Sequence, residues 1–309
     1  MRLTTTFFTL SLALLWSACA SNGPSWTEIL WDTWGVPHIY GEDAEGLHYA
    51  FGWAQMANHG DLILRLYGQA RGRAAEYWGE AYLNDDRFVR TMGVPERAQV
   101  WYETQNPAFR PYLDAFARGM NDYAEAHADL IDDEVEVVLP VVPNDMLAHT
   151  QRAIHLTFVG GGALQVAQRW GAPGSNAWAL APSRMVDGHA MLLANPHLPW
   201  SDLFTLFEAH LTGPGIDAYG AALVGMPTLG IVFNDYLGWT HTVNTFDGVD
   251  LYELTLVEDG YATQPHSPHR GDQLDLFARK ELRPARRTRA EIEAHLEKRE
   301  VLHGDEPGH

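Results

Sequence analysis

The spacing of hydrophobic residues changes along this chain from a helical period to a strand period. From Trp26 to about Ala163, apolar residues recur three and four positions apart, which places them on one face of an α-helix. Helices are therefore predicted around three sets of residues: Leu47, Ala50, Phe51 and Ala54; Leu62, Leu66 and Ala70; and Leu113, Phe116, Ala117, Met120, Tyr123 and Ala124.

Short apolar runs predict strands, most of them in the second half of the chain. The first two, Ile29–Trp31 and His38–Tyr40, flank a Gly35-Val36-Pro37 turn. Later runs recur at residues 176–180, 189–194, 204–211, 216–223, 229–234, 238–243 and 251–257, which is typical of short strands joined by turns. Because no helical pattern separates the later runs, we expect an antiparallel sheet. A helical region followed by a sheet predicts the α+β class.

A glycine-rich stretch separates the two regions. Gly160-Gly161-Gly162 opens it and Gly171-Ala172-Pro173-Gly174 closes it. Consecutive glycines lose the most conformational entropy when they are ordered, so they rarely form regular structure. The pattern predicts a linker or an exposed segment that is open to processing.

The first 20 residues have the features of a targeting segment. Arg2 precedes an uncharged run that ends at Trp16, and small residues follow up to Ala20. This order predicts a secretory signal peptide over residues 1–20, and the run is too short for a typical membrane span. Residues 15–19 are also close to a bacterial lipoprotein box, which would leave lipid on Cys19. A periplasmic or secreted protein and a membrane-anchored lipoprotein both remain open.

Composition excludes several classes of protein. Hydrophobic residues make up 46% of the chain, enough for a large core. The formal charge is −19, whereas a nucleic-acid-binding protein must neutralise phosphates with lysine and arginine. There is one cysteine, so an intramolecular disulfide framework is excluded.

Ser175 is the main candidate for a nucleophile. It follows Gly174 at the start of a predicted strand. If the Gly174–Ser175 bond breaks, Ser175 gains an α-amine with an ordinary pKa near 8. That amine can accept the hydroxyl proton and replace the histidine of a conventional triad. The surrounding residues do not form the G-x-S-x-G elbow of other serine hydrolases.

Several further motifs stand in a fixed order along the chain: residues 35–40 (GVPHIY), 52–55 (GWAQ), Gly72-Arg73 with Glu76, Asp86 and Arg90, 175–200, and 239–245 (WTHTVNT). With these motifs in this order, the sequence resembles the penicillin amidase family of N-terminal-nucleophile hydrolases, and within it the acyl-homoserine lactone acylases and aculeacin A acylases.

The resemblance implies an αββα sandwich made as an inactive precursor. The precursor would cut itself between Gly174 and Ser175 and form an α/β heterodimer without a nucleic-acid partner. Residues 21–159 would then be the α-subunit region, 160–174 the spacer and 175–309 the first part of the β-subunit. The implied substrates are small N-acyl amides: acyl-homoserine lactones, acylated lipopeptides or penicillins.

The resemblance also implies a role for each site residue. Ser175 would be the nucleophile and, through its α-amine, the base. His197 would hydrogen-bond near the nucleophile and help orient that amine. Val243 would donate its backbone N–H to the oxyanion.

The resemblance implies no required cofactor and leaves one metal site open. Asp247, Val249 and Asp250 match the calcium-binding run of some family members, as two carboxylates and a backbone carbonyl. Calcium takes six to eight oxygen ligands, and the α-chain glutamate that completes that site has no evident match near His155.

One departure from the family leaves an alternative function open. Family members continue well beyond position 309, and their second oxyanion donor, an asparagine side chain, lies in that later part. Residues 301–309 have no recognisable counterpart. The sandwich is therefore expected to be incomplete. The alternative is a truncated, catalytically inactive fragment that is exported or lipid-anchored.

Overall fold

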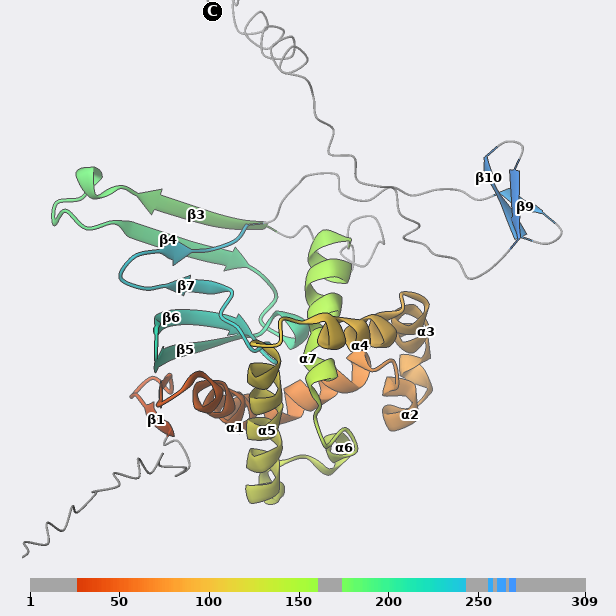
Figure 1. The fold of residues 1–309 in the computed structure, drawn as a ribbon, viewed down its shortest axis with the longest axis horizontal. Helices are drawn as coiled ribbons and strands as arrows, with labels where there is room; N and C mark the ends of the chain where they lie inside the picture. The colour runs from red at the N-terminus through yellow and green to blue at the C-terminus, as the bar shows by residue number, and fades with distance from the viewer. Residues whose placement is uncertain (1–26, 161–173, 243–254, 258–259, 265–266, 271–309) are drawn as a thin grey trace, which may run out of the picture. The chain divides into compact units, whose positions relative to one another are not determined.

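The computed structural model describes residues 27–160, 174–242, 255–257, 260–264 and 267–270. The chain divides into two compact units, Met1–Asp250 and Leu251–His309. The first contains all the described helices and most of the strands (Figure 1). The described part of the second is a three-stranded sheet, formed by β9 (Thr255–Val257), β10 (Gly260–Gln264) and β11 (Ser267–Arg270).

The helices follow the apolar periodicity predicted from the sequence. The longest are α1 (Ala44–Ala70) and α5 (Arg110–Ala126). Their predicted apolar positions are buried, except for Leu62, which is partly buried. The others are α2 (Ala74–Trp78), α3 (Leu83–Thr91), α4 (Val94–Thr104), α6 (Asp133–Glu136) and α7 (Pro143–Thr150), which continues as the π-helix Gln151–Val159. Short 3₁₀ turns span Glu80–Tyr82, Ala128–Leu130, Pro182–Arg184 and Asp202–Phe204. None of the helices in the described ranges is both long enough and apolar enough to span a bilayer.

Two glycines let α1 and α5 pack closely. A Cβ on Gly52 would lie 2.2 Å from the carbonyl oxygen of Phe116, and a Cβ on Gly119 would lie 2.0 Å from that of Tyr49. No side chain fits in these gaps without a backbone shift. Gly52 belongs to one of the family motifs, and the structure gives it this packing role.

The main sheet joins strands from both sides of the glycine-rich stretch. Its order is β1 (Thr27–Trp31), β2 (Pro37–Gly41), β5 (Leu206–Gly213), β6 (Ile216–Leu223), β7 (Ile231–Phe233) and β8 (Gly238–Trp239). All neighbours are antiparallel except β2 and β5, which are parallel. The strands after Ser175 pair antiparallel with one another, as predicted, and the parallel pair joins them to a strand from the first part of the chain. A parallel pair needs a long crossover, and here the helices between β2 and β5 provide it.

β3 (Gly174–Leu180) and β4 (Met191–His197) form a separate two-stranded ladder. Its register pairs Gly174 with His197 and Leu180 with Met191. The predicted turn at Asp187-Gly188 is present, since Gly188 has a φ of 74°. The turn is part of the connection between Leu180 and Met191, which is longer than the two-residue loop of a tight hairpin.

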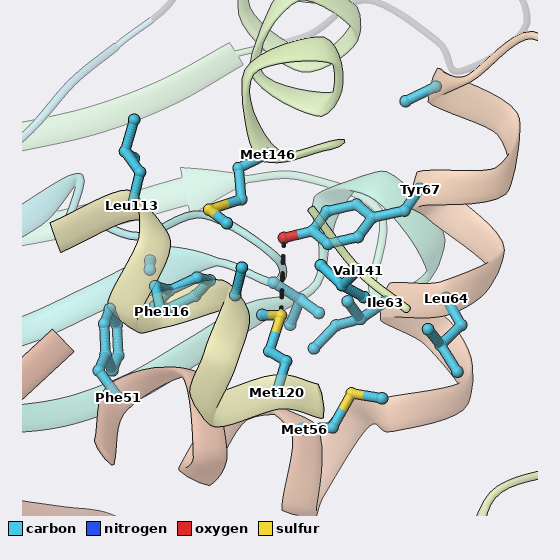
Figure 2. Close-up of a cluster of buried hydrophobic side chains, with 14 of the residues drawn as sticks. Phe51, Met56, Ile63, Leu64, Tyr67, Leu113, Phe116, Met120, Val141 and Met146 are labelled. Carbon is cyan, nitrogen blue, oxygen red and sulfur yellow. Dashed lines mark hydrogen bonds between the residues drawn. The ribbon is translucent and has the colours of Figure 1, made fainter. Parts of the chain in front are cut away.

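The core lies between α1, α5, α7 and one face of the main sheet. Figure 2 shows side chains from these helices directed at one another, among them Phe51, Phe116 and Met146, which are fully buried. The Tyr67 hydroxyl donates to the Gly225 carbonyl at 2.6 Å and lies 3.9 Å from the Met120 sulfur. The strands contribute buried side chains from alternate positions: Ile39, Phe207, Ala209, Leu211 and Ala222.

Another family motif shapes the corner where α1 meets α2 and α3. The Asp86 carboxylate accepts hydrogen bonds from the backbone N–H groups of Ala74 at 2.9 Å and Ala75 at 2.7 Å. These N–H groups would otherwise lack a partner at the start of α2. Arg90 donates from Nε to the Gly72 carbonyl at 2.6 Å. The residues therefore stabilise local structure.

Candidate active site

Ser175 is the second residue of β3 and is partly buried. Its hydroxyl donates a hydrogen bond to the carbonyl oxygen of Gly174 at 2.6 Å. The hydroxyl oxygen therefore lies beside the peptide group that self-cleavage would break. The strand positions it there because β3 begins at Gly174.

His197 lies across the ladder from this peptide bond. It is the last residue of β4 and pairs with Gly174. A Cβ built on Gly174 would lie 3.7 Å from His197 Nδ1. The structure therefore brings together two residues that lie 22 positions apart and that the sequence analysis had selected, Ser175 and His197.

Two asparagines contact the other ring nitrogen of His197. Its Nε2 lies 3.1 Å from Asn195 Nδ2 and 3.4 Å from Asn176 Nδ2. Asn176 and Asn195 are directly opposed in the ladder. With Nε2 engaged by the amides, Nδ1 is the nitrogen that faces Gly174. Sequence reasoning did not assign these asparagines a role, although their flanking positions beside Ser175 and His197 were a usable signal.

The segment before Val243 also reaches Ser175. Thr242 donates from Oγ1 to the Ser175 carbonyl at 2.8 Å, across 67 positions of sequence. Trp239 Nε1 donates to His241 Nε2 at 3.0 Å. Val243 itself lies outside the described residues, so its role in oxyanion binding stays a prediction.

Asp247, Val249 and Asp250 also lie outside the described residues, as does Cys19. The calcium prediction and the lipid-anchor prediction therefore stay predictions. Within the described ranges, no group of three or more histidine, cysteine, aspartate or glutamate side chains is placed to hold a metal ion.

His149, on α7, shows how strongly burial in the core can lower the pKa of a histidine. Complete burial, with Arg152 nearby, lowers the pKa of His149 to about 3. Its Nε2 lies 3.0 Å from the Val224 carbonyl oxygen, so Nε2 carries the hydrogen and donates. The ring is therefore neutral and structural, and it joins α7 to the residues after β6.

Comparison with known proteins agrees with these motifs. The model of the penicillin amidase family matches residues 26–264. The acyl-homoserine lactone acylase PvdQ of Pseudomonas fluorescens is 30% identical over 271 residues, which cover 74% of this chain and 34% of that protein. The aculeacin-A acylase of Actinoplanes utahensis is 42% identical over 85 residues, or 27% of this chain and 11% of that protein.

A solved structure is also similar. It is a thermostable penicillin G acylase from Alcaligenes faecalis, with 21% identity and a TM-score of 0.39, covering 47% of this chain and 82% of the solved chain. The present chain spans about one third of the length of the curated acyl-homoserine lactone acylases that it matches. The family match and the mixture of helices and sheet confirm the predicted α+β N-terminal-nucleophile fold class. The chain belongs to the penicillin amidase family.

Proposed function

We propose that Ser175 is the N-terminal nucleophile of an amidohydrolase that is made as a precursor. The observation that carries this proposal is the 2.6 Å hydrogen bond from the Ser175 hydroxyl to the Gly174 carbonyl. His197 on β4 pairs with Gly174, and Thr242 after β8 donates to the carbonyl of Ser175, in the next peptide group along the chain. Family membership supports the assignment, because the family is one of amidases.

Self-cleavage would proceed by an acyl shift. Ser175 Oγ bonds to the Gly174 carbonyl carbon, the C–N bond to Ser175 breaks, and the hydroxyl proton ends on the freed α-amine. Water then hydrolyses the ester, which releases a Gly174 carboxylate and restores the hydroxyl. The products are two polypeptides that stay together as an α/β heterodimer.

The freed α-amine then serves as the base for amide hydrolysis. Its ordinary pKa is near 8, so a useful fraction is unprotonated at neutral pH. It takes the Oγ proton as Oγ attacks the substrate carbonyl, and the leaving amine receives that proton. The Val243 backbone N–H would stabilise the oxyanion, which for one such donor is worth about 3–4 kcal/mol. Water finally clears the acyl-enzyme.

The substrate class follows from the relatives. The names of the similar proteins point to acyl-homoserine lactones and to aculeacin A, and the sequence resemblance extends the second kind to acylated lipopeptides. We propose N-acyl amides of these two kinds, with penicillins as a third. We also propose export through residues 1–20, followed either by cleavage after Ala20 or by attachment of lipid to Cys19. Fractionation of cells that express Cys19→Ala beside the parent tests the anchor.

Intact mass spectrometry of the expressed chain tests the nucleophile. The parent should yield two polypeptides, the second beginning at Ser175, whereas Ser175→Ala should stay as one chain. Ser183→Ala is the matched control, because Ser183 is exposed on a nearby 3₁₀ turn, and it should cleave like the parent. Cleavage of Ser175→Ala at the same bond would refute the assignment.

One observation favours the alternative, a catalytically inactive chain that is exported or lipid-anchored. The β3–β4 ladder leaves large apolar side chains exposed, among them Trp178 at 55% and Leu193 at 45%. Exposed apolar patches of this kind are typical of an interface that needs a covering surface. A folded, soluble parent chain that remains uncut would support this alternative over self-cleavage.

A further inference from the structure

We propose that His38 and His210 form a binding site for one divalent transition-metal ion of the Zn²⁺ type. The site lies on the main sheet, on the face opposite the helical core. It is separate from Ser175, and its geometry is that of the uncut chain, so it does not depend on the proposed self-cleavage.

The strands place the two histidines side by side. His38 on β2 and His210 on β5 are direct partners in the parallel pair. Their neighbours Ile39 and Leu211 are buried in the core, so the alternation of a strand turns both imidazoles to the other face. The two Nδ1 atoms lie 3.1 Å apart.

Carboxylates face the outer nitrogen of each ring. His210 Nε2 lies 2.8 Å from Asp217 Oδ1, and His38 Nε2 lies 3.7 Å from Asp32 Oδ2. Asp32 Oδ1 accepts hydrogen bonds from the backbone N–H groups of Trp34 at 2.8 Å and Val36 at 2.9 Å, which hold the carboxylate in place beside His38. Because a carboxylate only accepts hydrogen bonds, His210 Nε2 carries the hydrogen and donates to Asp217. The 3.7 Å between Asp32 and His38 Nε2 is too long for a hydrogen bond.

This arrangement leaves the lone pair of His210 Nδ1 on the side of His38. In the metal-free chain, a hydrogen on His38 Nδ1 can be donated to that lone pair across 3.1 Å. A metal ion takes the place of this hydrogen, with both Nδ1 atoms as ligands, and the carboxylates then orient the rings from behind, as in many zinc sites.

The distance and the access both suit a metal ion. With Zn–N bonds of about 2.0–2.1 Å, two ligands of a tetrahedron lie about 3.3 Å apart, close to the 3.1 Å between the Nδ1 atoms. Imidazole suits zinc, copper and nickel. The two side chains are 29% and 25% exposed, so an ion can enter and water can complete its coordination. The described residues offer no third histidine, cysteine or carboxylate ligand.

The site would tie together the two halves of the sheet. β2 precedes the glycine-rich stretch and β5 follows it, and this pair is the parallel junction of the sheet. An ion held by both histidines therefore adds a cross-link at that junction. If the Gly174–Ser175 bond is cut, the same ion would join two polypeptides.

Calorimetric titration of ZnCl₂ into the untagged full chain tests the site. We expect one ion per chain. Asp217→Asn should weaken binding about 10–100-fold, and His38→Gln and His210→Gln should weaken it at least as much. His189→Gln is the control, because His189 is exposed and lies in the connection between β3 and β4. It should bind like the parent.

A spectroscopic measurement on the parent alone covers the case in which a variant fails to fold. Bound Cu²⁺ should show electron paramagnetic resonance coupling to two imidazole nitrogens. Zinc binding that is equal in the parent and in folded His210→Gln would overturn the proposal. So would the absence of two-nitrogen coupling, and the pair would then hold only a proton.

Discussion

Gln55 on α1 links the helical region to the sheet region through two buried hydrogen bonds. The side chain is fully buried. Its Nε2 donates to the Met226 carbonyl at 2.9 Å, and its Oε1 accepts from the Gly225 N–H at 2.9 Å. Replacing Gln55 with alanine would leave both backbone groups buried without these partners. Each such group costs about 1–3 kcal/mol, so we expect Gln55→Ala to lose about 2–6 kcal/mol of stability.

Urea unfolding measures this loss. The experiment uses the Ser175→Ala background, so that a single polypeptide unfolds. The slope increases with chain size, so about 3 kcal/mol per molar urea applies here, and the midpoint should fall by roughly 0.7–2 M. Gln55→Met keeps most of the volume but not the hydrogen bonds, and it should lose nearly as much stability as Gln55→Ala.

Gln99 offers a matched control. It also makes two side-chain hydrogen bonds, with Glu103 and Asn144, but it is exposed. Gln99→Ala should change stability by no more than about 0.5 kcal/mol. If Gln55→Met is as stable as the parent, the loss in Gln55→Ala comes from volume, and the hydrogen-bond argument is wrong.

Two further predictions concern packing and pH. Gly52→Ala should lower stability by about 1–3 kcal/mol or more, because the new Cβ would lie 2.2 Å from the Phe116 carbonyl oxygen. Gly230→Ala is the control, because there the nearest atom would lie at an ordinary 3.9 Å. Thermal melting should give a lower melting temperature for Gly52→Ala than for Gly230→Ala, and equal melting temperatures would contradict the packing argument. His149 is neutral in the fold because burial, with Arg152 nearby, lowers its pKa to about 3. The unfolded chain takes up that proton below about pH 6.5, so stability should fall from pH 6.5 toward pH 3, by up to about 1.4 kcal/mol per pH unit. Urea midpoints from pH 7 to 4.5 should fall less steeply in His149→Gln, and parallel curves would count against this account.

Local patterns in the sequence determined the elements of the fold and the candidate for the nucleophile. The helices α1 and α5 follow from apolar residues three and four positions apart, and β6 spans the predicted residues 216–223. The motifs around Ser175 and Trp239 were enough to indicate the family that the comparisons then established. These features are readable because they depend on neighbours within a few positions of one another.

Only the tertiary structure decided which distant residues meet. β2 pairs with β5 in parallel, and this pairing brings His38 into contact with His210, which lies 172 positions later in the sequence. The Thr242 hydrogen bond to Ser175 likewise depends on how the chain returns to β3. Sequence periodicity shows which face of a strand is buried, but it carries no information about which strand lies beside it. That choice follows from how the whole core packs, and in this protein it assembles both the candidate active site and the proposed metal site.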